Sequence, residues 1–577
     1  MLPRSALVSL LLTSLLALPA LGQAKDPAAN LPAGVLAYLG TTGVDDLLTK
    51  ARQTPMGQMF MDKKFMETML SQPGMKEGLD QITEGLNEMA RELGFASYEE
   101  IPYPSGPMGL AVYAEGEKVH VVMFADLGEK KASIEEVLNK MVAKQLDEDP
   151  QAKRSTEEVE GEKVVVLRKG ESEDAVHYLI SGNSFLLANN MDIMTKTLRL
   201  MKGKGEPLSK SDVYRKLQTA CQPMGEISMI VDIAGLAKLG LATGGDADGQ
   251  ASKALDYTGL LKIKPMVGTV RMAHPGPTDM SVHIYMPVEG LNPKVLAIVD
   301  RNKPLAELAD AAGLTPDVAS AMVFSLRLDK VYDMAMDIAD SAEPGTRAMA
   351  EGQIKDMELP NGQRLNLLDN FINKMIGPVS FQMSLKKPYD EASLQMALGL
   401  GHNDAKAVGD VIKTLTGMAP FFQTEEFLGT TVYNIPEGLL PMEMPFELGF
   451  AVTGRALALG MSESVRSTIR SEKGEASKLS ESEAFKNMTK SLPRDGVLLF
   501  YSDPIVMQDF AEEMVKSGKG KESSNPLIQM MFGELDADYV ELSRKFATYS
   551  VGVLRQAENG TVWEFVGIAS PAPKKGE

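Results

Sequence analysis

A repeated stretch constrains this chain more than any other feature of its sequence. Residues Pro265 to Pro287 recur as Tyr549 to Pro571, with a constant offset of 284 positions. Each copy has two runs in which apolar and polar residues alternate, joined by a glycine-containing turn. This pattern predicts a β-hairpin. Chance would supply roughly one or two identities over such a stretch. Eight positions agree: Val267, Gly268, Arg271, Ala273, Gly276, Val282, Ile284 and Pro287 meet Val551, Gly552, Arg555, Ala557, Gly560, Val566, Ile568 and Pro571.

Further matches extend the repeat to most of the chain. A second group keeps the offset of 284: Pro32, Ala37 and Asp45 meet Pro316, Ala321 and Asp329. In the middle the offset falls to 271: Gly106, Leu208, Gly225 and Asp232 meet Gly377, Leu479, Gly496 and Asp503. We therefore predict a tandem duplication, with a first unit over residues 25–290 and a second over residues 291–577. A chain of 577 residues is long enough for two such units, each with its own core.

The local patterns predict an α+β fold. Apolar residues at helical spacing indicate helices at 44–51, 79–93 and 192–201, and Ser133 with Glu136 has the spacing of a capping box. The acidic run from Gln145 to Glu162 is expected to be a solvated linker. Runs with the apolar pattern of β-strands indicate strands at 110–113, 119–125, 164–167, 176–180 and 185–188. Strands joined mostly by hairpins favour antiparallel sheets with packed helices over a doubly wound parallel sheet. The units are expected to form either two lobes or one continuous sheet.

The N-terminus has the features of a secretory signal peptide. Arg4 supplies a positive charge, Ala6 to Leu18 is mostly apolar, and small residues follow Pro19. We expect cleavage after Ala24, with Gly22 as the second choice, and an exported mature chain that is periplasmic or secreted. An uncleaved membrane anchor is the alternative, although the apolar run is short for a membrane span.

The charge and the cysteine usage limit the partners. The formal net charge is -19 and the pI is about 5.0. An acidic surface repels phosphate backbones, so nucleic acid is not an expected partner. Cys221 is the single cysteine of the chain, which excludes an intrachain disulfide. A reactive thiol is one possibility, but no histidine lies near Cys221 in sequence, so we expect a buried or incidental residue.

One short segment carries recognisable motifs. From Leu31 the chain reads L-P-A-G-V-L-A-Y-L-G, then an amphipathic stretch, then Q-T-P-M-G-Q-M-F. Over roughly Leu31 to Met69 it resembles a family of secreted bacterial proteins of unknown function, which open with an L-P-A-[DG] strand and a T-P-[LM]-G helix. That family has no established activity, so the resemblance implies export and assigns no functional residue.

Metal-binding patterns are weak throughout the sequence. Asp246, Asp248 and Gly249 resemble the start of an EF-type calcium loop, but the twelfth position is Tyr257 instead of Glu. No histidine lies three or four residues from another, so a zinc site has little support; the five are His120, His177, His274, His283 and His402. We expect structural or surface roles for them.

Catalytic patterns are no stronger. Ser384 to Lys387 matches S-x-x-K by letters, but the companion motifs of that chemistry are missing from the sequence. Three pairs of adjacent acids could act as glycosidase carboxylates only if the fold singled one of them out: Glu99–Glu100, Glu135–Glu136 and Glu512–Glu513. We therefore predict no catalytic residue, no cofactor-binding residue and no metal ligand.

Methionine is the compositional exception, with 37 residues. Methionines can serve as flexible core filler, line an apolar groove for a lipid, peptide or partner surface, or bind copper(I) through their thioethers. Local spacing suitable for copper occurs at Met59–Met61 and at Met442–Met444. The densest group is Met56, Met59, Met61, Met66, Met69 and Met75. Core filler is the simplest of the three readings.

These observations favour an extracytoplasmic, non-enzymatic binding or scaffold protein with two homologous lobes. Its partner would be a protein, a peptide or a lipid, held between the two units or in the methionine-rich helical layer. The alternative is an extracytoplasmic hydrolase with a dispersed active site, because catalytic residues need not be close in sequence.

Overall fold

The computed structural model divides the chain into two compact units. Unit 1 consists of Met1–Gly245 and Lys264–Pro287, and unit 2 of Asp246–Ile263 and Val288–Glu577. The predicted signal segment and most of the helix predicted at 79–93 lie outside the described residues, so both stay predictions. The structure describes residues 26–62, 90–91, 95–97, 101–170, 175–245, 249–272, 280–390, 392–419, 421–435, 447–523, 525, 528–529, 532–533 and 535–571.

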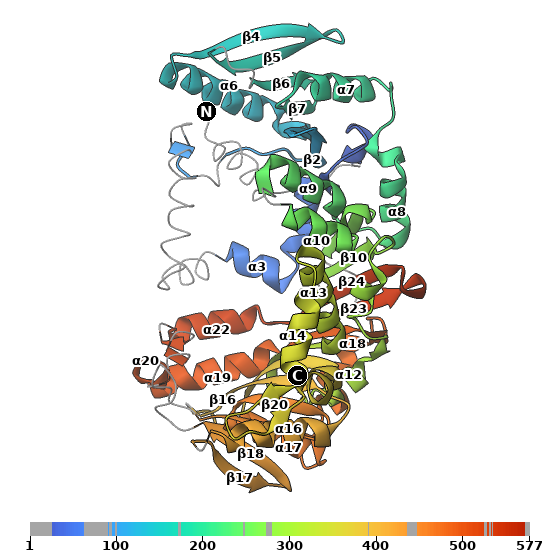
Figure 1. Cartoon of the computed structure of the whole chain (residues 1–577). Helices are drawn as coiled ribbons and strands as arrows, with labels where there is room; N and C mark the ends of the chain where they lie inside the picture. The colour runs from blue at the N-terminus through green and yellow to red at the C-terminus, as the bar shows by residue number, and fades with distance from the viewer. Residues whose placement is uncertain are drawn as a thin grey trace. The chain divides into compact units, whose positions relative to one another are not determined.

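Unit 1 is built on an antiparallel sheet (Figure 1). Its strands pair in the order β4-β5-β6-β7-β3-β2-β1-β8-β9-β10. They are β1 (Ala37–Thr41), β2 (Met108–Glu115), β3 (Lys118–Asp126), β4 (Ala152–Val159), β5 (Glu162–Lys169), β6 (Ala175–Ser181), β7 (Ser184–Ala188), β8 (Ile227–Val231), β9 (Met266–Met272) and β10 (Met280–Pro287). The last two form the predicted hairpin, which the pairing of β9 with β10 confirms.

Helices pack on this sheet. Helix α6, the longest among the described residues, buries Ile134 and Val142 in one cluster with Met123 and Leu187 of the sheet. At the start of α8, the side chain of Ser211 accepts a hydrogen bond from the backbone N–H of Tyr214. The described helices of unit 1 are α2 (Val44–Ala51), α3 (Pro55–Met61), α6 (Lys131–Glu148), α7 (Met191–Met201), α8 (Asp212–Ala220) and α9 (Ile233–Gly240).

Unit 2 is built on a second antiparallel sheet. Its strands pair in the order β17-β18-β19-β20-β16-β15-β12-β22-β23-β24. They are β12 (Val318–Arg327), β15 (Ile376–Leu385), β16 (Leu394–Gly401), β17 (Gln423–Phe427), β18 (Thr430–Ile435), β19 (Leu448–Val452), β20 (Ala456–Met461), β22 (Leu498–Ser502), β23 (Thr548–Ala557) and β24 (Val562–Pro571). The second predicted hairpin is confirmed by the pairing of β23 with β24.

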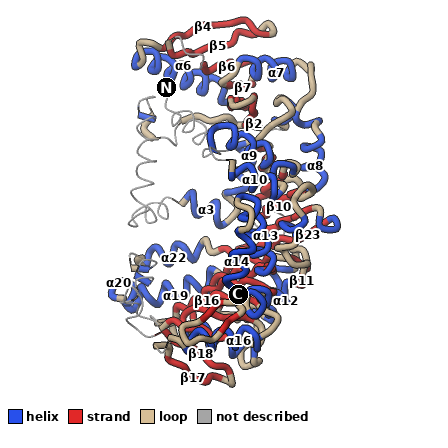
Figure 2. The backbone as a smooth tube through the Cα atoms, in the orientation of Figure 1, coloured by secondary structure: helices blue, strands red, loops and turns tan. Residues whose placement is uncertain are grey.

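Helices cover parts of both faces of the second sheet (Figure 2). One large cluster joins Leu308 of α12 and Phe485 of α18 to the buried strand residues Val323, Leu499 and Val553. The described helices of unit 2 are α10 (Gln250–Thr258), α11 (Pro293–Leu296), α12 (Leu305–Ala311), α13 (Leu328–Ala342), α14 (Thr346–Lys355), α15 (Leu367–Asn370), α16 (Ala405–Gly417), α17 (Ser462–Glu472), α18 (Glu483–Thr489), α19 (Pro504–Ser517), α20 (Lys519–Glu522) and α22 (Ala537–Lys545).

The predicted fold class is confirmed, because antiparallel sheets and packed helices make up the structure as an α+β fold. In the part of the chain that the structure describes, no helix combines the length and the apolar composition that crossing a membrane requires. The two sheets also share one strand order when β1 is matched with β12 and β10 with β24. A duplication would produce such a match, and the duplication itself stays a prediction.

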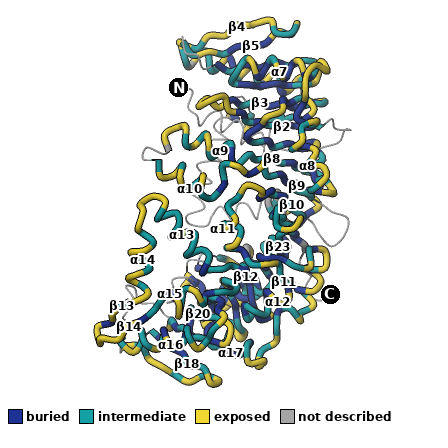
Figure 3. The backbone as a smooth tube through the Cα atoms, turned by 45° about the vertical axis from the view of Figure 1, so that its right-hand side comes forward, coloured by how far each residue is buried: buried dark blue, intermediate teal, exposed yellow. Residues whose placement is uncertain are grey.

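Two local predictions are wrong. The acidic run expected to be a linker contains β4, an edge strand that pairs with β5 and exposes its side chains along most of its length (Figure 3). An edge strand needs backbone partners on one side only, so charged residues are tolerated there. The capping box is also absent, since α6 begins at Lys131 and Ser133 already lies inside the helix.

The strand pairing also corrects the sequence alignment by one residue. Ala37 lies opposite Val112, and Ser320 lies opposite Met383. Because Val112 and Met383 are related by the offset of 271, Ala37 matches Ser320 and not Ala321.

The last strand of the repeat shows the same shift. Val267 lies opposite Tyr285, and Val551 lies opposite Ile568, so the offset from β10 to β24 is 283. A shift of one residue moves a side chain to the other face of a sheet. The identities Val282/Val566 and Ile284/Ile568 therefore do not mark matched positions.

Candidate functional site

A row of apolar side chains crosses one face of the unit 2 sheet. The residues lie directly opposite one another on successive strands, so their side chains point to the same face. Four of them are exposed, by 37% to 48% of their surface: Met322, Phe381, Leu398 and Phe500. We call the following set the apolar row, in spatial order: Phe450, Leu459, Leu398, Phe381, Met322 and Phe500.

Two groups of helices flank the apolar row on the same face. Val408 and Ile412 of α16 pack against Leu400 and Leu457, toward one end of the strands. Toward the other end, α19 and α22 pack against Leu385 and Leu394; they contribute Phe510, Met514 and Val540. The middle of the row lies in the gap between these two helical clusters, while Phe450 and Leu459 at one end also pack against the α16 cluster.

The gap contains an open groove of about 350 Å³. This volume falls in the usual range for ligand sites, roughly 300–1,000 Å³. Every residue in its described wall is apolar: Phe381, Met396, Ala397, Leu398, Ile435, Leu448, Gly449, Phe450, Leu459 and Gly460. The groove thus offers dispersion contacts and no side-chain hydrogen bond.

The opposite face of the same strands is polar and buried. Ser380, Gln382, Ser384 and Gln395 are at most 9% exposed. Helix α17 covers this face and supplies partners for the amides: Ser464 Oγ donates to Gln395 Oε1 at 3.1 Å, and Gln382 Nε2 donates to Thr468 Oγ1 at 3.5 Å. Strands β15 and β16 therefore bury their polar side and expose an apolar one.

The matching face of unit 1 is covered at β3 and β7, whereas Leu39 of β1 and Leu110 of β2 are half-buried. Its strand pairing places Leu39, Leu110, Met123 and Leu187 in the corresponding row. Met123 and Leu187 are 5% and 8% exposed, whereas Leu398 at the matched position in unit 2 is 39% exposed. Helix α6 provides the cover in unit 1, through Ile134, Leu138, Val142 and Leu146.

Helix α16 is the matching helix of unit 2, and it is too short to do the same. It has 13 residues, whereas α6 has 18. Counted from the two N-caps, Val142 corresponds to Thr416, and Leu146 corresponds to a position beyond Gly417, where α16 ends. Two apolar side chains that close the face in unit 1 thus have no counterpart on α16.

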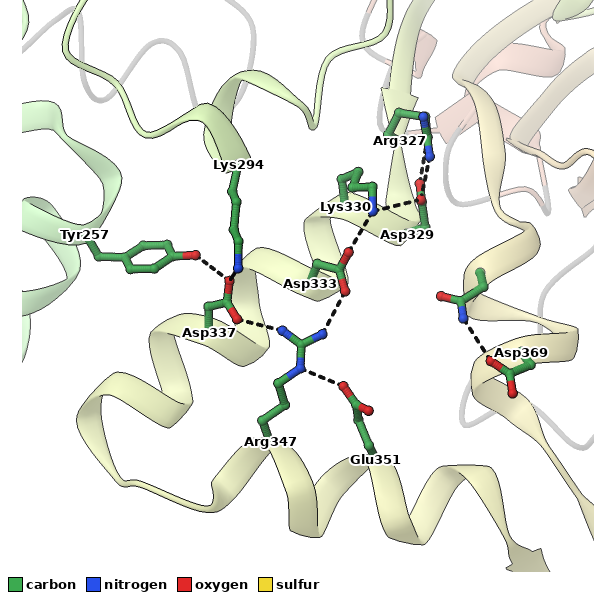
Figure 4. A network of polar contacts seen from close by, with 11 residues as sticks. Tyr257, Lys294, Arg327, Asp329, Lys330, Asp333, Asp337, Arg347, Glu351 and Asp369 are labelled. Carbon is green, nitrogen blue, oxygen red and sulfur yellow. Dashed lines mark hydrogen bonds and ion pairs between the residues drawn. The ribbon is translucent and has the colours of Figure 1, made fainter.

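A network of ion pairs joins four helices elsewhere in unit 2 (Figure 4). Arg347 on α14 is its centre: the guanidinium binds Asp333 at 2.9 Å, Asp337 at 2.6 Å and Glu351 at 2.6 Å. Asp337 on α13 also accepts from the Tyr257 hydroxyl of α10 at 2.6 Å and pairs with Lys294 of α11. At the start of α13, Lys330 pairs with Asp333 at 2.8 Å.

The protonation states in this network follow from its pairing. Burial alone would raise the pKa of Asp337, but donation from Lys294, Tyr257 and Arg347 outweighs burial and holds that pKa at about 2. Burial and the bond to Asp337 raise the pKa of Tyr257 to about 12. The carboxylates and cations around Arg347 are thus held in mutual ion pairs, and the network fits a structural role.

The residues that the sequence singled out do not come together. His120 on β3, His177 on β6 and His402 directly after β16 are each buried, and His274 lies outside the described residues. Ser384 is buried in β15, while Lys387 pairs with Asp509. Among the described residues, no three His, Cys, Asp or Glu side chains gather as metal ligands would. The prediction that Cys221 is buried is confirmed.

The methionine hypotheses remain untested. Of the dense group, Met56, Met59 and Met61 lie on α3, while Met66, Met69 and Met75 lie outside the described residues, as do Met442 and Met444. Two other methionines, Met322 and Met396, belong to the apolar row or its groove.

The sequence pattern did not predict the groove. In β15 the letters S-F-Q-M-S-L alternate between polar and apolar residues, a pattern that ordinarily turns the apolar side to the core. A usable signal was the polar composition of α17, which reads S-E-S-V-R-S-T-I-R-S-E and suits a polar sheet face.

Comparisons with known proteins add little. No known family matches the chain, and no curated protein matches it. Among solved structures, one titled as crystal form I of TP0453 matches with 10% identity and a TM-score of 0.22, covering 47% of this chain and 81% of that one. A similarity at this level carries no argument about function.

Proposed function

We propose that the protein is an exported, non-enzymatic binding protein whose unit 2 groove holds the hydrocarbon part of a lipid-like ligand. One observation carries the proposal: a sheet exposes its apolar face in a groove while it buries its polar face under α17. Large exposed apolar surfaces in soluble proteins mark interaction sites. The signal-like N-terminus supports an extracytoplasmic location, as an expectation from sequence.

The chemistry of the groove favours hydrocarbon over a polar ligand. A polar group placed against Phe381, Leu398 or Phe450 would lose its water and gain no side-chain hydrogen bond, which costs about 1–3 kcal/mol for each group. A methylene placed there gains about 0.8 kcal/mol. An extended peptide gains its affinity from main-chain bonds at a sheet edge, whereas this groove lies on a sheet face.

The matching surface of unit 1 also favours a hydrocarbon ligand. Where the groove is open in unit 2, the corresponding surface of unit 1 is filled by aliphatic side chains of α6, including Val142 and Leu146. A ligand that replaces them has to present aliphatic groups of similar size. An acyl chain does so without backbone polar groups.

The experiment compares two matched leucines. Leu398→Lys places a charge in the groove, and Leu236→Lys places the same charge on α9 of unit 1; the two side chains are 39% and 40% exposed, so neither change disturbs a core. We expect the unaltered chain and Leu236→Lys to bind a long-chain fatty acid in calorimetry, and Leu398→Lys to bind it at least about tenfold more weakly.

Native mass spectrometry of protein purified from its own envelope gives an independent readout. The unaltered chain is expected to retain a lipid that Leu398→Lys has lost. An apo mass for the unaltered chain, together with no fatty-acid binding, would overturn the proposal. Equal binding by Leu398→Lys and Leu236→Lys would also do so.

A further inference from the structure

We infer that the ligand is an unbranched acyl chain, which lies across the strands along the apolar row and is selected by its length. This inference rests on the proposed function and specifies the ligand of the same groove. It is argued from the length of the row, from its width and from the residues at its two ends.

The length of the row follows from the strand order. It runs over β19, β20, β16, β15, β12 and β22. Neighbouring strands are about 4.8 Å apart, so the row is roughly 24 Å long from Phe450 to Phe500. The open groove covers the β19–β15 half of the row, and Met322 and Phe500 continue it as an exposed track.

The width of the uncovered strip is limited by the flanking helices. On β16, Leu400 packs in the α16 cluster and Leu394 in the α19 cluster, which leaves Met396 and Leu398 between them. Two residues along a strand span roughly 7 Å. A strip of these proportions fits an extended chain better than a fused ring system.

Aromatic side chains close both ends of the row. At one end, the Phe450 ring stacks on Tyr433 at 5.1 Å between centroids and meets the edge of Phe422 at 5.3 Å. At the other end, Phe500 lies opposite Gly552 of the neighbouring strand β23. The Phe565 ring lies over Gly552, since a Cβ built on this glycine would be 2.8 Å from Phe565 Cζ. The row therefore has a definite length.

The test measures binding against chain length. Saturated fatty acids of roughly 8 to 18 carbons are titrated into the full mature chain and into Met322→Lys, with Met349→Lys as the control. Met322 is 48% exposed within the row, and Met349 is 62% exposed on α14, outside it. We expect affinity for the unaltered chain to rise about fourfold per methylene and then to level off.

Met322→Lys is expected to keep the affinity for the shortest chains, which fit the groove over β19–β15, and to lose about tenfold or more for the longest. Met349→Lys should follow the unaltered chain at every length. Phe500→Lys provides a second variant at the far end, with the same selective loss expected. Circular dichroism checks that each variant is folded.

The outcomes separate this inference from the proposed function. Binding that does not depend on length, or a Met322→Lys effect equal at all lengths, overturns the acyl-chain row and leaves the apolar site. Failure of the unaltered chain to bind at any length overturns the proposed function itself.

Discussion

At the scale of single residues, the two units treat a matched aspartate differently. Asp45 and Asp329 each lie in the first turn of the helix after the first strand, and both are buried. Arg327 holds Asp329 in a bidentate pair at 2.7 and 2.8 Å. Arg327 is the N-cap of its helix, and the N-cap in unit 1 is Gly43, so Asp45 Oδ1 has no hydrogen-bond partner among the described residues. Burial raises the pKa of Asp45, and Lys130 offsets this rise only in part.

This difference predicts a pH-dependent stability effect. Because the folded pKa of Asp45 is raised above the unfolded value of about 3.9, ionisation destabilises the fold as the pH rises from that value through the folded pKa. Asp45→Asn removes the charge. We expect a gain on the order of 1 kcal/mol at pH 7, and none near pH 3.

Calorimetry at the two pH values measures the effect, and hydrogen exchange of α2 assigns it to unit 1. Asp46→Asn serves as the control, because Asp46 is more exposed and pairs with Lys50 at 2.8 Å. A melting midpoint for Asp45→Asn at or below that of the unaltered chain at pH 7 would contradict the account.

At the scale of elements, β15 and β16 show why periodicity alone is not enough. Their alternation correctly indicates strands, but it does not say which side faces the core. The orientation depends on two helices. The serines and the threonine of α17 pack against the polar face of the sheet, and α16 ends too early to cover the apolar face. The exposed row is a consequence of two neighbouring helices.

The polar side of these strands gives a prediction of its own. Ser464→Ala removes the donor to Gln395 Oε1 and leaves a buried acceptor unpaired, so we expect a loss of about 1–3 kcal/mol. Changing both partners, as Ser464→Ala with Gln395→Leu, removes the unpaired group and should recover part of the loss.

Urea unfolding of the two single variants and the double variant completes a mutant cycle. Thr414→Ala on the exposed side of α16 is the control for a lost hydroxyl. If the double variant is less stable than the two single losses added together, the Ser464–Gln395 contact does not have the assigned role.

At the scale of the whole molecule, the path of the chain departs from a simple tandem order. Residues Asp246–Ile263 precede the last hairpin of unit 1 in sequence but belong to unit 2. They contribute α10, whose Tyr257 donates to Asp337 and whose backbone accepts from Asn292 Nδ2 at 2.9 Å. The predicted boundary between residues 290 and 291 would separate α10 from these partners.

This path predicts a stability effect that sequence position would not suggest. Tyr257→Phe removes a hydrogen bond to a charged carboxylate, and we expect a loss of about 1.5–3 kcal/mol in unit 2. Hydrogen exchange should show faster opening of α13, where Asp337 lies. Tyr285→Phe in β10 is the matched control, and equal opening of α13 in both variants would contradict the assignment.

The sequence by itself determined the fold class and several strands and helices of unit 1, because alternation and helical spacing are local properties of the chain. It also indicated the repeated hairpin, whose identities survive in β9 and β23. Only the tertiary structure decided the register of β1 and β10, the face that β15 and β16 turn to the core, and the place of α10. These depend on pairing and packing between residues far apart in sequence. The groove arises from such packing, since it exists where α16 stops short of the surface that α6 covers in unit 1.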